Sequence, residues 1–303
     1  MALSLLEVLR RGSGYLAARG SDSPRLDTEL ILGSVLGLSR LHLYLQFERP
    51  LLPAELDRLR PLLRRRAEGC PVAYLVGTRE FMGLEMAVSP AVLIPRPETE
   101  QLVERGLSVL AARPAASGPP RAADLGTGSG CIAIALADRD PRCTVDAVDR
   151  SAAALAVAAG NVDRHHLADR VRLWQGDWAE PLRGRGPYDL VLANPPYVTT
   201  AEMAELPGTV AAYEPRLALD GGPDGLAPHR AILAGVAPLL GPAATLILEV
   251  DPRRAGALAA LCEARWPDGR CTVRADLAGR DRVVETRLPP LPAAALRAVA
   301  VGS

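Results

Sequence analysis

The feature that most constrains the fold is a regular alternation of short apolar runs and helix-like segments in the second part of the chain. The apolar runs are bounded by turn residues, as strands are, at residues 122–125, 144–148, 171–175, 189–193, 244–250, 271–274 and 283–287. Segments rich in alanine and leucine lie between them, at residues 131–137, 152–159 and 231–240. This alternation predicts an α/β domain with a mostly parallel seven-stranded sheet and helices on both faces.

A different pattern precedes this domain. Residues 1–75 show mostly helical periodicity, with Ser23 as an N-cap, Pro24 in the first turn, and a second helical segment that opens at Pro53. Pro61 lies inside that segment, so we expect a kink or two short helices there. The sequence therefore predicts a small N-terminal helical domain.

The two parts are joined by a segment whose apolar residues alternate. They recur at every second position in two runs, at Val72, Tyr74 and Val76 and again at Leu84, Met86 and Val88. Such alternation predicts a β-hairpin that links the domains. The predicted organisation is a helical substrate-docking domain at residues 1–75, a hairpin linker at 76–97, a catalytic domain at 98–288 and a Pro/Ala-rich tail at 289–303.

Composition excludes several classes of protein. The 35 basic side chains are all arginine and are matched by 35 acidic ones, so a lysine base is impossible and stable nucleic-acid binding by bulk charge is not expected. The arginine run at residues 64–66 favours a solvated face over a partner-binding surface. The five cysteines are scattered and the four histidines lack ligand spacing, which indicates no metal site, no disulfide framework and a cytoplasmic protein. No secretory signal or membrane-length apolar run is present.

A glycine-rich loop follows the first predicted strand. Its residues are, in order, Asp124, Leu125, Gly126, Thr127, Gly128, Ser129 and Gly130. Glycines let a backbone turn sharply and approach a ligand, although they also serve in plain tight turns. A dinucleotide-binding fingerprint would place its third glycine at Cys131. The spacing seen here, with an acid ahead of it, resembles that of S-adenosylmethionine-dependent methyltransferases with a Rossmann-like fold.

Acidic and aromatic residues follow the next two predicted strands. Asp149 ends the second strand, where a carboxylate can accept hydrogen bonds from both ribose hydroxyls. The alternative is a helix N-cap, a role that Ser151 could fill equally well. Asp177 and Trp178 follow the third strand, and we predict that they contact adenine, although Trp178 could instead be a core aromatic.

The fourth strand runs into the tetrapeptide Asn194, Pro195, Pro196 and Tyr197. Ligands of open α/β sheets bind beyond the carboxyl ends of the strands, so this motif is predicted to lie over the cofactor. The Asn194 side-chain oxygen and the Pro195 carbonyl can each accept one N–H of a planar nitrogen, and Tyr197 can pack on the flat group. We therefore predict catalysis mainly by orientation and electrostatics. The alternative is a rigid turn after a buried strand.

Together these motifs resemble the HemK/PrmC family, the peptide chain release factor N5-glutamine methyltransferases. The resemblance spans nearly the whole chain. Further motifs that carry it lie at residues 23–27, 71–75, 94–100, 213–215, 221–226 and 276–284. The chain departs from the family pattern at Asp251, where relatives usually carry glycine.

The resemblance implies transfer of a methyl group from S-adenosylmethionine to the glutamine amide in the Gly-Gly-Gln motif of release factors. Residues 126–130, Asp149 and Trp178 would then contact the cofactor. Residues 194–197 would hold the glutamine, with Asn194 also near the cofactor. An N6-adenine methyltransferase of DNA or RNA and a glutamine methyltransferase of a ribosomal protein are the alternatives. A binding protein without catalytic activity is a third.

Overall fold

The computed structural model describes residues 3–290 and divides into two compact units. The first joins the N-terminal segment up to Thr78 with Val88–Pro90 and Pro207–Tyr213. The second contains Arg79–Ala87, Ala91–Leu206 and the chain from Glu214 onward. The domain boundaries expected from the sequence stay predictions, and most of the expected tail at residues 289–303 lies outside the described residues.

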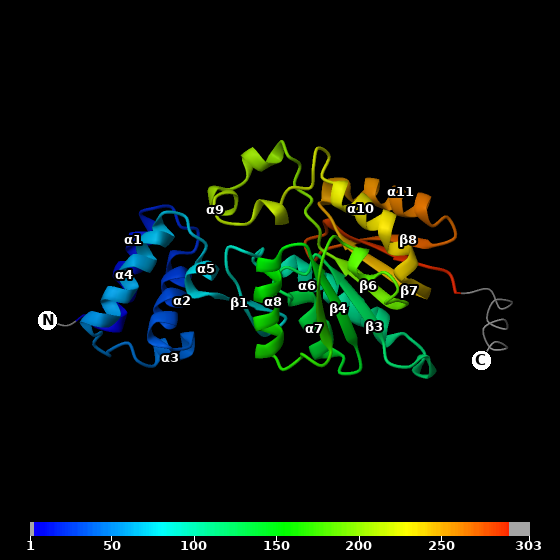
Figure 1. The fold of residues 1–303 in the computed structure, drawn as a ribbon. Coiled ribbons are helices and arrows are strands. Elements are labelled where there is room, and N and C mark those ends of the chain that lie inside the picture. The colour runs from blue at the N-terminus through cyan, green and yellow to red at the C-terminus, as the bar shows by residue number, and fades with distance from the viewer. Residues whose placement is uncertain (1–2, 291–303) are drawn as a thin grey trace. The chain divides into compact units, whose positions relative to one another are not determined.

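The first unit is helical (Figure 1). Its helices are α1 (Leu5–Ala17), α2 (Pro24–Leu36), α3 (Arg40–Tyr44), α4 (Pro53–Ala67), α5 (Val72–Val76) and the short α9 (Gly208–Ala211). The apolar faces of α1 to α5 form one core around Leu5, Ile31 and Leu43, each fully buried. Ser23 and Pro24 begin α2 as predicted, although the Ser23 hydroxyl makes no capping hydrogen bond.

Three expectations for this unit were wrong or incomplete. Val72–Val76 is a helix rather than a strand, bracketed by Pro71 at its N-cap and Gly77 in the left-handed region at its C-cap. Pro61 does not divide α4 into two short helices, because α4 is one helix from Pro53 to Ala67, and the alternative of a kink stays a prediction. Arg66 does not lie on a solvated face, because its Nε contacts Asp27 Oδ2 at 2.7 Å with 15% of the Arg66 side chain exposed.

The second unit is built on a seven-stranded sheet with the order β5-β4-β3-β6-β7-β9-β8. The strands are β3 (Arg121–Leu125), β4 (Thr144–Asp149), β5 (Val171–Gln175), β6 (Tyr188–Ala193), β7 (Leu240–Glu249), β8 (Arg270–Ala275) and β9 (Asp281–Arg287). β9 runs antiparallel to both of its neighbours and the other pairings are parallel. The predicted mostly parallel seven-stranded sheet is confirmed.

Helices cover both faces of this sheet (Figure 1). α6 (Pro97–Ala111), α7 (Cys131–Arg139) and α8 (Ala152–Arg164) pack against one face, and α10 (Ala227–Val236) and α11 (Ala255–Arg265) against the other. Apolar side chains on the two faces form separate cores, which explains why the central strands read as continuous apolar runs.

A two-stranded hairpin, β1 (Thr78–Phe81) and β2 (Leu84–Ala87), supplies Phe81 and Met86 to the core under α6 and α7. The hairpin is thus shorter than the sequence predicted, because its expected first strand is α5. Among the helices of residues 3–290, we find none with the length and apolar character that crossing a membrane requires.

Candidate active site

The predicted site residues gather beyond the carboxyl ends of the parallel strands. β3 pairs with β4 on one side and with β6 on the other, so the chain order reverses at β3. In open α/β sheets this reversal opens a crevice for ligands. The glycine loop follows β3, Asp149 ends β4, and the Asn194 motif follows β6.

The glycine loop needs its glycines for two reasons. Gly126 and Gly130 have φ angles of +80° and +84°, which residues with a Cβ rarely adopt. A Cβ on Gly126 would also come within 3.1 Å of the Trp178 ring, and one on Gly130 within 3.1 Å of Ile134. The loop backbone therefore lies directly against Trp178 and Ile134 and leads into α7.

Asp124 supports this loop from beneath. Its side chain is fully buried, and its Oδ2 accepts hydrogen bonds from the Thr127 hydroxyl at 2.6 Å and from the backbone N–H of Ala133 at 3.2 Å. Burial raises the pKa of this carboxyl from 3.8 to about 7, against the lowering effect of these hydrogen bonds. Asp124 does not line the cavity described below, so its position is that of a loop anchor.

We expect Asp124→Asn to gain stability over the natural protein as pH rises from about 4 to about 7. In that window the unfolded chain has released the Asp124 proton while the folded protein retains it, so rising pH favours unfolding. Asparagine cannot ionise and keeps one oxygen for Thr127 and Ala133. Denaturant unfolding at a series of pH values measures the difference, and a difference that stays constant across the window would contradict the expectation.

Asp149 binds the loop from the next strand. Its Oδ2 accepts the backbone N–H of Gly128 at 2.9 Å, and its Oδ1 accepts the N–H of Ser151 at 2.9 Å. Ser151 itself caps α8, because its hydroxyl accepts the N–H of Ala154 at 3.2 Å. The alternative role of Asp149 as the helix N-cap is therefore filled by Ser151, and the carboxylate lies at the cavity wall.

Trp178 belongs both to the core and to the cavity wall. It packs against the apolar core under α10 and α11, and it also lines the cavity beside Gly126. Its φ angle of +47° marks a tight turn after β5. Asp177 is exposed, lies 3.5 Å from Arg150 and lines the same cavity.

The backbone of the Asn194 motif is held by the loop at residues 219–225. The Val198 N–H donates to the Leu219 carbonyl at 3.0 Å, and the Gly221 N–H donates to the Val198 carbonyl at 2.7 Å. A Cβ on Gly221 would come within 2.8 Å of the Tyr197 Cα, and one on Gly225 would overlap the Tyr197 carbonyl oxygen. The glycines of the 221–226 motif therefore allow this loop to lie directly against Tyr197.

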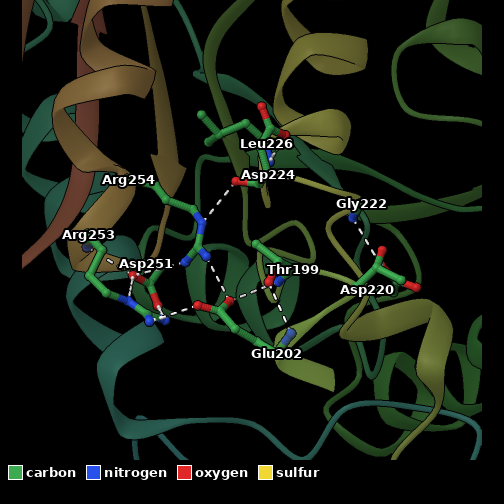
Figure 2. A network of polar contacts seen from close by, with 10 residues as sticks. Thr199, Glu202, Asp220, Gly222, Asp224, Leu226, Asp251, Arg253 and Arg254 are labelled. Atoms are coloured by element: carbon green, nitrogen blue, oxygen red, sulfur yellow. Dashed lines mark hydrogen bonds and ion pairs between the residues drawn. The ribbon is translucent and has the colours of Figure 1, made fainter. Parts of the chain in front are cut away.

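A network of charged residues holds the segment around Glu202 against the loop at residues 219–225 (Figure 2). Arg254 Nη2 contacts Glu202 Oε2 at 2.7 Å, and Arg254 Nε donates to the Asp224 carbonyl at 2.9 Å. Asp251 caps the short turn Pro252–Arg254, and its carboxylate pairs with Arg253 and Arg254. Its φ of −61° is an ordinary value, so aspartate is accepted here without backbone strain.

Two further side chains, whose partners the sequence did not reveal, also hold the site. Glu214, 6% exposed, accepts the N–H of Ile94 at 3.3 Å and pairs with Arg96, so the motifs at residues 94–100 and 213–215 bind each other. Asn161, fully buried, donates to the Ser129 carbonyl at 2.8 Å and bonds the backbone of Ala87. The partners of both residues are distant in the sequence, so these contacts could not be predicted from a local pattern.

A cavity of about 790 Å³ brings most of the predicted residues together. The predicted residues on its wall are Gly126, Thr127, Gly128, Ser129, Asp149, Asp177, Trp178, Asn194 and Pro196. The other predicted residues, Asp124, Gly130, Pro195 and Tyr197, do not line the cavity. A glycine-loop backbone, a carboxylate and an indole on one wall fit a nucleoside bearing a short charged chain, as S-adenosylmethionine does.

Comparison with known proteins gives the family. The family model described as the PrmC N-terminal domain matches residues 7–77, and the one described as the methyltransferase small domain matches residues 101–209. The release factor glutamine methyltransferase of Geobacter sulfurreducens is 42% identical over 287 residues, covering 94% of this chain and 97% of that protein. That of Moorella thermoacetica is 45% identical over 280 residues, covering 92% and 97%.

A solved structure supports the fold. The hMettl16 catalytic domain in complex with a MAT2A 3′UTR hairpin aligns with a TM-score of 0.55 at 15% identity, covering 77% of this chain and 84% of that one. At such low identity this likeness concerns the methyltransferase fold alone. The long relatives at more than 40% identity decide the assignment: the chain is an S-adenosylmethionine-dependent enzyme that belongs to the release factor glutamine methyltransferase family.

Proposed function

We propose that residues 194–197 perform the reaction of this family in this chain. That reaction transfers a methyl group from S-adenosylmethionine to the side-chain amide nitrogen of the glutamine in the Gly-Gly-Gln motif of peptide chain release factors. The single observation that supports the placement is that Asn194 lies on the same cavity wall as the glycine loop and Asp149. A donor and an acceptor bound in that cavity would be neighbours.

The chemistry requires orientation because an amide nitrogen is a poor nucleophile. Its lone pair is delocalised into the carbonyl, and both N–H groups must be held so that the nitrogen faces the donor. The Asn194 side-chain oxygen and the Pro195 carbonyl are the acceptors we assign to them. Pro195 and Pro196 bring no N–H of their own, so no donor of the motif competes for these oxygens.

The cofactor site is proposed on the other part of the cavity wall. S-adenosylmethionine, when bound, supplies an electrophilic methyl group. Asp149 would accept the ribose hydroxyls and Trp178 would contact the adenine, with Gly126 and Gly128 close to the rest of the molecule. We also propose that the enzyme works in the cytoplasm without stable nucleic-acid or membrane binding, since its formal net charge is zero.

Mass spectrometry of a release factor co-expressed with this chain tests the proposal. We expect one added methyl group on the glutamine of the Gly-Gly-Gln motif, and none when Asn194→Ala replaces the natural enzyme. An unmodified glutamine beside methylated adenine or a methylated ribosomal protein would refute the assignment of the substrate.

A further inference from the structure

The Asn194 side chain has a partner outside its own motif. Its Nδ2 donates to the Thr99 Oγ1 at 3.0 Å. Thr99 lies in the first turn of α6, is 2% exposed and lines the cavity beside Asn194. Because the amide nitrogen is used by Thr99, the amide oxygen Oδ1 remains for a group in the cavity. This is the orientation that an acceptor of a substrate N–H requires.

Behind Thr99 lies Glu249, the last residue of β7. Its side chain is 1% exposed, and neither carboxyl oxygen has a hydrogen bond of ordinary geometry. Burial raises the pKa of this carboxyl to about 7, and the hydroxyls of Thr99 and Tyr197, which face it, oppose the rise. A buried carboxyl without hydrogen bonds lowers the stability of the folded protein. The presence of Glu249 beside the Thr99 and Tyr197 hydroxyls therefore needs an explanation.

We propose that Thr99 and Glu249 are positioning residues for methyl transfer, which hold the Asn194 amide with its oxygen toward the substrate. A hydroxyl has one proton to donate. When that proton points to the Glu249 carboxylate, the Thr99 oxygen can only accept from its other neighbour, and Asn194 must present its NH2 group. An ionised Glu249 beside Thr99 thereby favours one direction of the Asn194–Thr99 hydrogen bond, in which Nδ2 donates to Oγ1.

Protonation of Glu249 would release this constraint. A neutral carboxyl can donate to the Thr99 oxygen, and the Thr99 proton is then free to point to Asn194 and favour the turned-over amide. The correct orientation is thus present above a pH of about 7 and is lost as pH falls through that value.

Ionisable groups of several elements surround Glu249. They are Glu98 of α6, Cys131 of α7, Tyr197 of the motif, Arg282 of β9 and His229 of α10. Arg282 lowers the pKa of Glu249 and Glu98 raises it. Burial lowers the pKa of His229 to about 4 and raises that of Cys131 to about 12, so both are neutral near pH 7.

The first test compares hydroxyl and methyl groups at residue 99. We expect Thr99→Val to lower kcat for release factor methylation about tenfold or more, with the Kd for S-adenosylmethionine unchanged, because valine keeps the shape but not the hydroxyl. Thr99→Ser restores the hydroxyl and should recover most of the lost kcat. Thr245→Val is the matched control, since Thr245 is a buried threonine of β7 whose hydroxyl has no partner among the described residues.

The second test uses pH. At saturating cofactor and substrate, kcat of the natural enzyme should fall on the acidic side of about pH 7, and Glu249→Gln should abolish this limb. Saturation separates the effect from that of Asp124, whose titration acts on the loop that we assign to the cofactor. A kcat for Thr99→Val equal to that of the natural enzyme, or an acidic limb that Glu249→Gln leaves in place, would overturn the proposal.

Discussion

Replacing Asn194 with alanine should abolish turnover while leaving cofactor binding largely intact. The substitution removes the side-chain oxygen that we assign to a substrate N–H, and such preorganised groups contribute about a hundredfold or more to rate. Asn194 projects from a loop whose backbone is held independently by residues 219–225. Its loss should therefore leave the glycine loop and Asp149 in place.

Calorimetric titration with S-adenosylmethionine and single-turnover methylation of a release factor measure the two effects separately. Asn194→Asp is an informative companion variant, because it keeps the shape but cannot donate to Thr99. A thermal melt excludes unfolding as the cause. Turnover that survives in Asn194→Ala would refute the role assigned to this side chain.

Gly225→Ala should be strongly damaging although Gly225 lies outside the cofactor loop. Gly225 has a φ of +74°, and a Cβ there would overlap the Tyr197 carbonyl oxygen and the side chain of Arg254. The left-handed backbone costs about 1 kcal/mol for alanine, and overpacking adds about 1–3 kcal/mol. Displacement of Tyr197 should also reduce kcat, because its carbonyl belongs to the motif.

Gly279→Ala is the matched control. Gly279 has nearly the same φ, +76°, but open space around its Cβ position. Gly279→Ala should lose only the roughly 1 kcal/mol of unfolding free energy that the left-handed backbone costs alanine, and its kcat should stay close to that of the natural enzyme. Equal losses of stability and of turnover in the two variants would show that contact with Tyr197 is unimportant.

The sheet was predictable because its strands are continuous apolar runs between turn residues. Both ends of Val171–Gln175 were predicted correctly, and the predicted start of Arg121–Leu125 was one residue late. Val72–Val76 was mistaken for a strand because five residues cannot distinguish the two periodicities: Val72 and Val76 are also four apart, as helical neighbours are. The flanking Pro71 and Gly77 were the better guide to the helix.

The site was predictable only where its residues are consecutive. The glycine loop and residues 194–197 can be recognised as motifs, and the fold brings both to one cavity. Thr99 lies within the motif at residues 94–100, but that motif does not reveal its hydrogen bond to Asn194, and Glu249 is an isolated residue at the end of β7. The positioning role that we propose for Glu249 therefore had no signal in the sequence.

The amino ends of the strands lie opposite the carboxyl ends that form the site. Gly118, just ahead of β3, lies at the amino ends of the strands, is exposed, and has open space around its Cβ position. Exposed turns of this kind are where chains best tolerate foreign segments or new termini. A label or tag inserted at Gly118 would therefore lie at the amino ends of the strands, away from the residues that line the cavity.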